Sequence, residues 1–442
     1  LPLSLSLSLP LSLSRSLSLP LTHIVPSLAH PLPRSLALAL VRSPVGYLAE
    51  IIIWDISGIP FDGGSPVAEP SVLHRLRLHK VMVQALDFSV DGKFLASIGG
   101  ADDNNLVIWN VASGKAICGS PAAHDTAVTL KWMNNVDPSK PPALVTGGIK
   151  ALRMWDLDEI NRKVRPKECS TQKEIRTYTC IAVSDDDTRL YCGTTTGDVM
   201  VIDSASQQMI TQGPPKGACL GCGVQAIHVM GRTDELLVGS GDGELMILDL
   251  LSPSLKVKCV QKVDGAVSSI AMDSVGEFFF AGTEKSNMYL VQYAGLVAEL
   301  KTTCHAEHIN DVQYAREYSD LFVTCAGSDI RVWHSKSFSE LLRVQVPNQE
   351  CNCIAFMPSG TSIVSGWNDG KIRSFLPQSG SLQYVINEAH RLTGVGNSSG
   401  GVVPKNGVTS ICPSNDCKRV LSGGSDGQVR VWAVSKGTQV MI

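Results

Sequence analysis

Short apolar strands recur along the chain at nearly regular intervals. Eight six-residue segments have apolar residues at their first and fourth positions, and they begin at Val83, Ala127, Tyr178, Val224, Val267, Ile309, Cys351 and Val408. Their fourth residues are separated by 44, 51, 46, 43, 42, 42 and 57 positions. The segments are apolar along most of their length, as expected for strands that are covered on both faces. This spacing indicates eight copies of one structural unit.

Two further strands follow in most units. The second ends in Gly, Ser or Thr, as at 94–100, 143–148, 237–240, 363–366 and 420–424. The third closes on Trp or another apolar residue, and pairs such as Gly197-Asp198, which suit a tight hairpin, precede it. A weaker outer strand usually completes the unit. Four short strands with a period of roughly 40–45 residues are typical of a blade of a WD-repeat β-propeller. The sequence therefore predicts an all-β fold with almost no helix.

Few polar residues fit the hydrogen-bond pattern of such blades. In WD-repeat proteins an Asp in the turn before the third strand often bonds to a His near the start of the blade. Only His79 and His124 lie where that His is expected. We therefore predict degenerate blades that are held more by apolar packing than by polar networks. Trp155, Trp333 and Trp432 should pack at the ends of third strands.

Charge and composition exclude two classes of partner. The net charge is −3 and the Lys and Arg residues form no basic stripe, so we expect no nucleic acid partner. No segment approaches the ~18 apolar residues of a membrane span, so we expect no membrane partner. There are 13 cysteines, an odd number, and Cys180, Cys192, Cys325 and Cys353 lie in predicted strands as small core residues. This usage favours a reducing compartment.

The first residues differ from the rest of the chain. Leu and Ser alternate from Leu3 to Leu9 and from Leu11 to Leu19, as a translated CT-dinucleotide tract would. A secretory signal peptide is the competing interpretation, but there is no basic n-region, and Pro and Ser interrupt every apolar run. We expect residues 1–46 to be low-complexity sequence, disordered or non-native, and assign them no structure.

Motifs that resemble catalytic or metal sites have simpler interpretations. Ser425 and Ser398 lie in G-x-S-x-G matches, yet the first falls in a predicted hairpin and the second in a Gly-rich insertion. Cys219-x-x-Cys222 is a single pair in a linking loop, and Asp185-Asp-Asp187 is expected at an exposed turn. We predict no catalytic, cofactor-binding or metal-binding residue, no cofactor and no small-molecule substrate, so the protein is not expected to be an enzyme.

Longer stretches resemble one family of proteins. They are 117–123, 193–198, 329–334, 367–373, 384–387, 389–391 and 416–420, and Trp367-Asn-Asp-Gly-Lys-Ile-Arg373 is more specific than a general WD motif. Together, over about 51–432, they resemble the WD-repeat cilia- and flagella-associated proteins of motile axonemes.

This resemblance implies a non-enzymatic scaffold in the lumen of axonemal doublet microtubules. Its partners would be tubulin and other lumenal axonemal proteins, and its binding would stabilise the doublet and support motility. The resemblance also implies two tandem propellers of about seven blades each. Residues 47–300 would form the first, without its opening blades, and residues 301–442 would form the first three blades of a truncated second. The break between them is expected between Tyr293 and Thr303. Residues 57–71 and 392–406 are inserts relative to this pattern.

One alternative stays open at this stage. The eight units could close as a single eight-bladed ring that serves as a general cytoplasmic adaptor. The isolated third strand at 50–54 fits this ring poorly, because it adds a fraction of a ninth blade.

Overall fold

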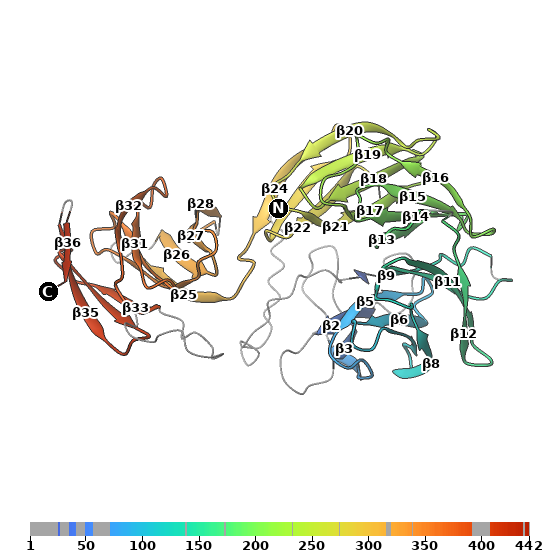
Figure 1. The fold of residues 1–442 in the computed structure, drawn as a ribbon, viewed down its shortest axis with the longest axis horizontal. Coiled ribbons are helices and arrows are strands. Elements are labelled where there is room, and N and C mark those ends of the chain that lie inside the picture. The colour runs from blue at the N-terminus through green and yellow to red at the C-terminus, as the bar shows by residue number, and fades with distance from the viewer. Residues whose placement is uncertain are drawn as a thin grey trace. The chain divides into compact units, whose positions relative to one another are not determined.

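The computed structural model describes residues 25–26, 35–40, 49–55, 71–137, 139–171, 174–231, 233–273, 275–314, 320–337, 339–390, 407–435 and 438–441. Within them the chain forms nine four-stranded sheets and no helix, which confirms the predicted all-β blade architecture. The strands follow one another across every sheet in sequence order (Figure 1). The chain divides into two compact units, unit 1 (Leu1–Lys301) and unit 2 (Thr302–Ile442).

Unit 1 contains six blades in its described part. Their strands are β1 (Val25–Pro26), β2 (Ser35–Leu40), β3 (Glu50–Asp55) and β4 (Ser71–Leu76); β5 (Val83–Phe88), β6 (Phe94–Gly99), β7 (Asn105–Asn110) and β8 (Lys115–Pro121); β9 (Ala127–Trp132), β10 (Ala143–Gly148), β11 (Ala151–Asp158) and β12 (Lys163–Glu168); β13 (Tyr178–Val183), β14 (Arg189–Thr194), β15 (Val199–Asp203) and β16 (Met209–Gly213); β17 (Val224–Met230), β18 (Glu235–Ser240), β19 (Glu244–Asp249) and β20 (Lys256–Lys262); β21 (Val267–Met272), β22 (Phe278–Thr283), β23 (Asn287–Gln292) and β24 (Val297–Thr303).

The first blade differs from the expectation for residues 1–46. Strands β1 and β2 lie within that segment, to which the sequence analysis assigns no structure. Strand β2 alternates Leu with Ser or Ala, and it pairs along β3 with Leu36 opposite Trp54 and Leu38 opposite Ile52. The Leu-Ser tract and residues 57–70 of the expected first insert lie outside the described residues.

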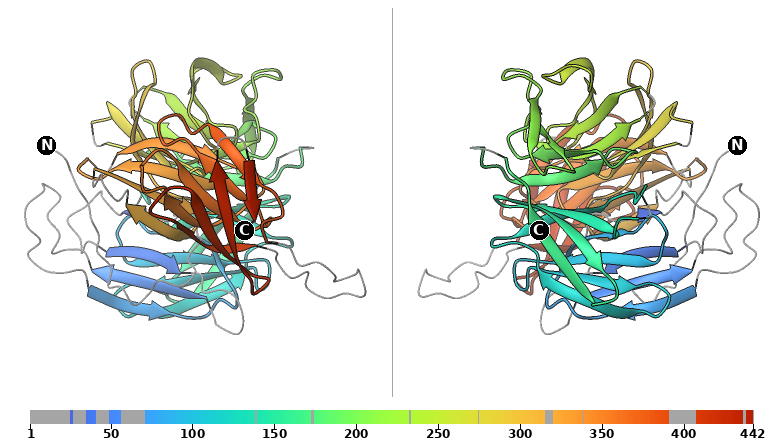
Figure 2. Two further views of the ribbon diagram at one scale, coloured as in Figure 1. Left: turned by 90° about the vertical axis from the view of Figure 1, so that its left-hand side faces the viewer. Right: turned by 90° about the vertical axis from the view of Figure 1, so that its right-hand side faces the viewer.

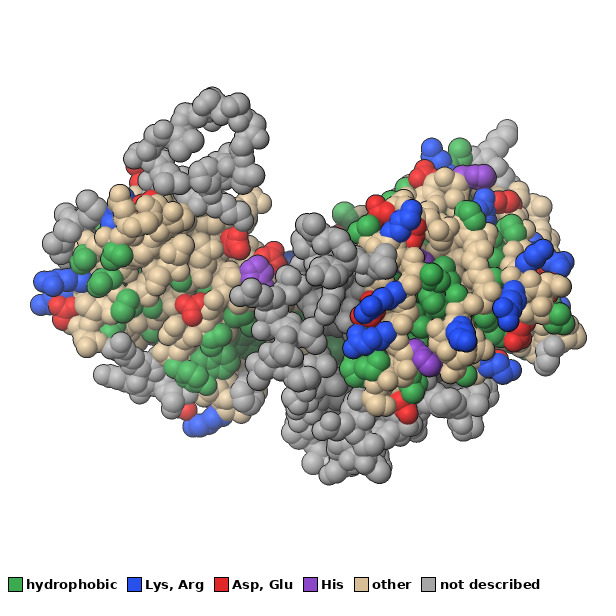
Figure 3. Space-filling view, turned by 90° about the horizontal axis from the view of Figure 1, so that it is seen from below, with side chains coloured by type: hydrophobic (Ala, Val, Ile, Leu, Met, Phe, Trp, Pro, Cys, Tyr) green, Lys and Arg blue, Asp and Glu red, His purple; other side chains and the backbone are tan. Residues whose placement is uncertain are grey.

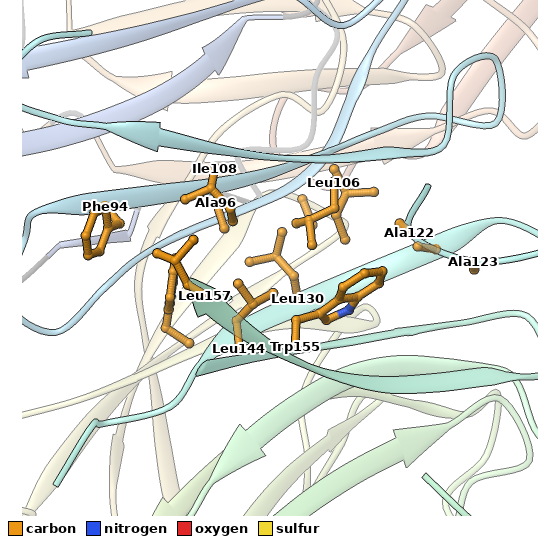
Figure 4. Close-up of a cluster of buried hydrophobic side chains, with 14 residues drawn as sticks. Phe94, Ala96, Leu106, Ile108, Ala122, Ala123, Leu130, Leu144, Trp155 and Leu157 are labelled. Atoms are coloured by element: carbon orange, nitrogen blue, oxygen red, sulfur yellow. The ribbon is translucent and has the colours of Figure 1, made fainter. Parts of the chain in front are cut away.

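Neighbouring blades of unit 1 pack face to face. We name the side of a blade toward the next blade in sequence its front face, and the side toward the preceding blade its back face. Between blades β5–β8 and β9–β12, the front-face residues Ala96, Leu106 and Ile108 meet the back-face residues Leu144 and Trp155, and all five are buried (Figure 4). Internal sheets are thus covered on both faces, which explains their nearly continuous apolar strands.

Unit 2 contains three blades in its described part. Their strands are β25 (Ile309–Tyr314), β26 (Leu321–Ala326), β27 (Asp329–His334) and β28 (Glu340–Gln345); β29 (Cys351–Phe356), β30 (Ile363–Trp367), β31 (Ile372–Phe375) and β32 (Leu382–Ile386); β33 (Val408–Pro413), β34 (Arg419–Gly424), β35 (Val429–Ser435) and β36 (Thr438–Met441). Apolar clusters fill the two spaces between these sheets. The last blade, red in Figure 2, lies beside the orange blade β29–β32. The expected insert at 392–406 lies outside the described residues.

The inner strand of every blade from β5 onward contains a bulge that skips its second residue. In β13, for example, Tyr178 and Cys180 pair with β14 and Thr179 does not. The skipped residue is unpaired in the ladder and can reach the neighbouring blade, so we name it the latch position. Latch side chains donate a hydrogen bond to the first carbonyl of the next inner strand in three places: Thr179 to Val224, Asn310 to Cys351 at 2.7 Å, and Asn352 to Val408 at 3.0 Å.

The predicted Gly-Asp and Asp-Gly turns adopt the positive φ that they require. Gly197 has a φ of 83°, and its carbonyl accepts the N–H of Leu220 at 3.0 Å. A Cβ at Gly197 would lie 2.0 Å from the carbonyl oxygen of Leu220. Glycine is therefore needed here both for its backbone conformation and for the close approach of the next connecting segment.

Candidate interaction surface

Three blades contain a buried chain of four hydrogen-bonded side chains. In blade β5–β8, Trp109 Nε1 donates to Ser97 Oγ at 2.8 Å, His79 Nε2 lies 2.8 Å from the same oxygen, and His79 Nδ1 lies 3.2 Å from Asp103 Oδ2. The corresponding residues are His305, Thr324, Asp329 and Trp333 in blade β25–β28, and His390, Ser422, Asp426 and Trp432 in blade β33–β36. Each chain ties the segment before the inner strand to the second and third strands.

The partners in these chains determine the protonation of the rings. A carboxylate can only accept, so Nδ1–H of His79 donates to Asp103, and Nε2 of the neutral ring accepts the Ser97 hydroxyl hydrogen. Burial lowers the pKa of His79 below its ordinary value, although Asp103 acts in the opposite direction. Burial alone would raise the pKa of Asp329, yet hydrogen bonds from His305 and Arg331 bring it below its ordinary value. These groups are engaged in holding the blades.

The structure corrects the expected distribution of these histidines. His79 is confirmed, whereas His124 is exposed, because Ala123 occupies the corresponding place four residues before the inner strand. His305 was not predicted, although its spacing to β25 equals that of His79 to β5. His390 was not predicted either, because the insert separates this residue from β33. Three blades thus contain such a network, and the prediction that apolar packing contributes more than these networks stays a prediction.

Tryptophan and arginine pack together on the back faces. Trp155 and Trp432 are buried, as predicted, whereas Trp333 is half-buried because its blade is the first of unit 2. Two residues before the closing Trp, Arg153 and Arg331 each place their guanidinium 6.0 Å from the ring centre. Such cation–π contacts add to the stacking of the blades.

The acidic and serine motifs have structural roles. Asp187 Oδ1 accepts the N–H of Asn134 at 2.7 Å, and its Oδ2 accepts that of Val136 at 3.0 Å, so this carboxylate joins two neighbouring blades. Asp186 accepts hydrogen bonds within its own turn. Ser425 lies in the turn between β34 and β35, where its Oγ accepts the N–H of Gly407 at 2.8 Å. Ser398 lies outside the described residues.

The cysteines form no disulfide in the described part of the chain. All thirteen are free thiols, and Cys219 and Cys222 are exposed in the loop between β16 and β17. Burial raises the pKa of Cys353 to about 12, as expected for an inert core thiol. Nowhere in the described ranges do three His, Cys, Asp or Glu side chains come together as metal ligands. Those ranges also contain no helix that could cross a membrane.

Four of the exposed apolar residues of unit 1 lie along one edge. Because each blade is an antiparallel meander, the loops between its first and second strands and between its third and fourth strands lie at the same edge, which we name the hairpin edge. Val136 and Val275 in the former loops and Ile160 and Leu251 in the latter are exposed, and Ile160 is 93% exposed. Side chains of this kind at loop tips are typical contact residues.

A small cavity of about 220 Å³ opens at the same edge. It lies between the β5–β6 and β9–β10 loops, and its lining includes Val90, Asp91, Trp132, Asn134 and Pro142. On the surface seen in Figure 3, Lys and Arg side chains lie beside Asp and Glu side chains. The hairpin edge thus offers apolar tips and a notch for a partner.

Comparison with known proteins identifies both the repeats and a set of relatives. The family model "WD domain, G-beta repeat" matches residues 70–110 and 400–433. Cilia- and flagella-associated protein 52 of Bos taurus is 41% identical over 399 residues, which cover 89% of this chain and 59% of the relative. The protein of that name from Chlamydomonas reinhardtii is 42% identical over 400 residues, which cover 90% of this chain and 59% of the relative.

A more distant match is WD repeat-containing protein 90 of Xenopus tropicalis, which is 24% identical over 89% of this chain and 21% of that protein. The chain spans about three fifths of the length of the relatives named Cilia- and flagella-associated protein 52. Repeats and blades agree with the family model, and the identity of about 40% extends over nearly all of the chain. The chain therefore carries WD repeats, and over 89% of its length it is similar to the proteins named Cilia- and flagella-associated protein 52.

Proposed function

We propose that this chain is a non-enzymatic scaffold of motile cilia and flagella. It binds tubulin and neighbouring proteins inside axonemal doublet microtubules, and thereby stabilises the doublet and supports motility. The observation that carries this proposal is the 41% identity, over 89% of the chain, to the bovine Cilia- and flagella-associated protein 52. The name of that relative indicates the cellular structure, and the stacked blades provide a rigid platform.

The use of polar side chains supports a scaffold. The His, Asp, Ser and Trp residues that could suggest catalysis are hydrogen-bonded to one another within blades. Asp187, in the most acidic motif, holds two blades together. These groups have partners inside the fold, so the surface loops are left to make contacts with other proteins.

We assign the partner contact to the hairpin edge of unit 1. Ile160 and Leu251 are exposed in loops between the third and fourth strands of their blades, and the cavity beside Val90 lies at the same edge. The net charge of −3 gives little long-range attraction, so affinity has to come from shape and enclosed contacts. Binding of this kind should resist moderate salt.

Stepwise extraction of axonemes tests the location. The full-length protein, tagged in a ciliated cell, should stay with the doublet microtubules through detergent and moderate salt. A soluble protein of the ciliary matrix serves as the control and should leave with the detergent. Release of the tagged protein with the membrane-plus-matrix fraction, or its retention in the soluble cytoplasm, would overturn the proposal.

Paired substitutions test the hairpin edge. Ile160→Asp and Leu251→Asp should each reduce retention on salt-washed axonemes several-fold, because a charge would enter an apolar contact. The matched control is Ile175→Asp, since Ile175 is 69% exposed in the segment between blades at the opposite edge. Loss of retention with Ile175→Asp alone would assign the contact to that opposite edge.

The single eight-bladed adaptor has no comparable support. It needs one continuous ring, whereas the described chain forms nine sheets in two compact units.

A further inference from the structure

The cavity at the hairpin edge of unit 1, which we name the notch, is small and mainly apolar. Its volume is about 220 Å³, below the roughly 300–1,000 Å³ of sites for small molecules. Its apolar lining consists of the buried Trp132 and Met133 and the half-buried Val90, Pro142 and Ala143. A space of this size suits one large apolar side chain of a partner, the kind of anchor on which binding between proteins often depends.

Hydrogen bonds fix residues that line the notch. The backbone N–H of Trp132 donates to Asp87 Oδ2 at 2.9 Å, and its Nε1 donates to the Asp87 carbonyl at 3.0 Å. Asn134, a further lining residue, donates its backbone N–H to Asp187 Oδ1 at 2.7 Å and its side-chain amide to the Ser184 carbonyl at 2.9 Å. Binding in a preformed space loses little conformational freedom, so a single side chain can contribute much of the affinity.

Carboxylates predominate in the loops around the notch. The notch lies between the loops at 89–93 and 133–142, and the bonds to Asn134 bring the loop at 184–188 beside it. Together these three loops contain five carboxylates and two lysines. The surroundings of the notch are therefore negatively charged.

The two lysines balance only the loops that form the notch. Lys93 Nζ lies 3.1 Å from Asp91 Oδ2, and Lys140 Nζ lies 3.9 Å from Asp137 Oδ2. The loop at 184–188 contains three carboxylates and no Lys or Arg. The excess of negative charge is therefore in this third loop.

Asp185 and Asp186 of the third loop are accessible to a partner. Both are exposed, and neither forms a salt bridge with a described residue. Hydrogen bonds from Ser184 and Thr188 hold the pKa of Asp186 below its ordinary value, so this side chain is charged at neutral pH. A cation of a partner seated in the notch would therefore lie near carboxylates that have no cation of their own.

We propose that the notch binds one aromatic or large aliphatic side chain from an extended segment of a neighbouring protein, and that Lys or Arg residues flanking this side chain bind Asp185 and Asp186. This partner chemistry rests on the proposed function, in which the hairpin edge contacts neighbouring proteins. The apolar side chain gives affinity, because it leaves water for an apolar space. The charges give selectivity, because an acidic segment would be repelled.

Three short peptides with blocked ends test this chemistry on the full 442-residue chain. They are Gly-Lys-Phe-Lys-Gly, Gly-Lys-Ala-Lys-Gly and Gly-Glu-Phe-Glu-Gly, each with a fluorescent label whose polarisation reports binding. The first should bind at least about tenfold more tightly than either of the others, because it alone has both the ring and the positive charges. Equal binding of the first and third peptides would overturn the proposal.

Substitutions in the chain locate the bound peptide. Ala143→Phe fills the notch and should weaken binding of Gly-Lys-Phe-Lys-Gly at least about tenfold, and Val90→Trp, from the other loop, should do the same. Asp185→Asn should weaken it about threefold. The matched control is Glu277→Gln, which removes one exposed charge from the hairpin edge two blades further on and should leave binding unchanged. Undiminished binding by a folded Ala143→Phe or Val90→Trp chain, checked by circular dichroism, would overturn the proposal.

Comparison with axonemes separates this proposal from the proposed function. A parent chain that stays on salt-washed axonemes but binds none of the peptides would overturn the partner chemistry and leave the scaffold function in place. A parent chain that leaves with the soluble matrix but binds Gly-Lys-Phe-Lys-Gly through the notch would support the partner chemistry and overturn the axonemal location.

Discussion

At the scale of single residues, the hydrogen-bond chains decide which histidines matter. His390 is completely buried, and its two ring nitrogens lie 2.9 Å from Asp426 Oδ1 and 2.7 Å from Ser422 Oγ. His124 is exposed. Two residues of one type, each near the start of a blade, thus have different consequences for stability, because only one of them has buried partners to satisfy.

Replacing these two histidines makes the difference measurable. His390→Ala should lower the free energy of unfolding by about 2–3 kcal/mol, because Asp426 and Ser422 would be left buried without their partner. His124→Ala should change it by less than about 0.5 kcal/mol. Urea unfolding followed by circular dichroism provides both values. Equal effects for the two variants would contradict the assignment of His390.

The buried His79 gives stability a dependence on pH. Burial depresses its folded-state pKa, so as pH falls below about 6.5 the unfolded chain takes up a proton that the folded chain does not. The contribution of His79 is present above that pH, and it is lost as pH falls toward the depressed pKa. His79→Gln should flatten the slope of unfolding free energy between pH 7 and pH 5 relative to the parent. An unchanged slope would show that His79 does not stay neutral.

At the scale of the elements, the inner strands could be predicted closely and the connections could not. The predicted inner strands Val83–Phe88 and Cys351–Phe356 are the observed β5 and β29, because a strand covered on both faces has a continuous apolar signal. The pairing of β2 was not predictable, because the low-complexity composition of its surroundings obscures a short alternating pattern. The bulges at the latch positions could not be predicted either, because one skipped residue does not change the apolar pattern of the strand.

The tight turns allow a matched test of glycine at the element scale. Gly197 and Gly295 have φ of 83° and 82°, but only Gly197 has a backbone oxygen close to where a Cβ would lie. Gly197→Ala should cost more than about 1 kcal/mol, and more than Gly295→Ala, which bears the backbone strain alone. Thermal unfolding of the two variants gives the comparison. A smaller cost at Gly197 would mean that the Leu220 segment moves away freely.

At the scale of the whole molecule, the hairpin edge could not be predicted from the sequence, because its residues come from separate repeats. Val136, Ile160, Leu251 and Val275 are far apart in the chain, and each looks like an ordinary surface residue when taken alone. Only the repeated meander brings their loops to one edge of unit 1. Charge could not reveal this surface either, because acidic and basic residues are nearly balanced.

The division into two units predicts that the loss of a core side chain in one unit destabilises that unit alone. Trp155 lies in a buried cluster of unit 1, and Trp432 lies in a buried cluster of unit 2. Replacing either by Ala should cost about 3–5 kcal/mol, because a large buried ring is lost. If each unit is a separate cooperative element, the added opening stays within it. Hydrogen exchange should then rise in peptides of unit 1 alone for Trp155→Ala, and in peptides of unit 2 alone for Trp432→Ala. Faster exchange in both units for either variant would mean that they unfold together, and that stability is shared along the entire chain of blades.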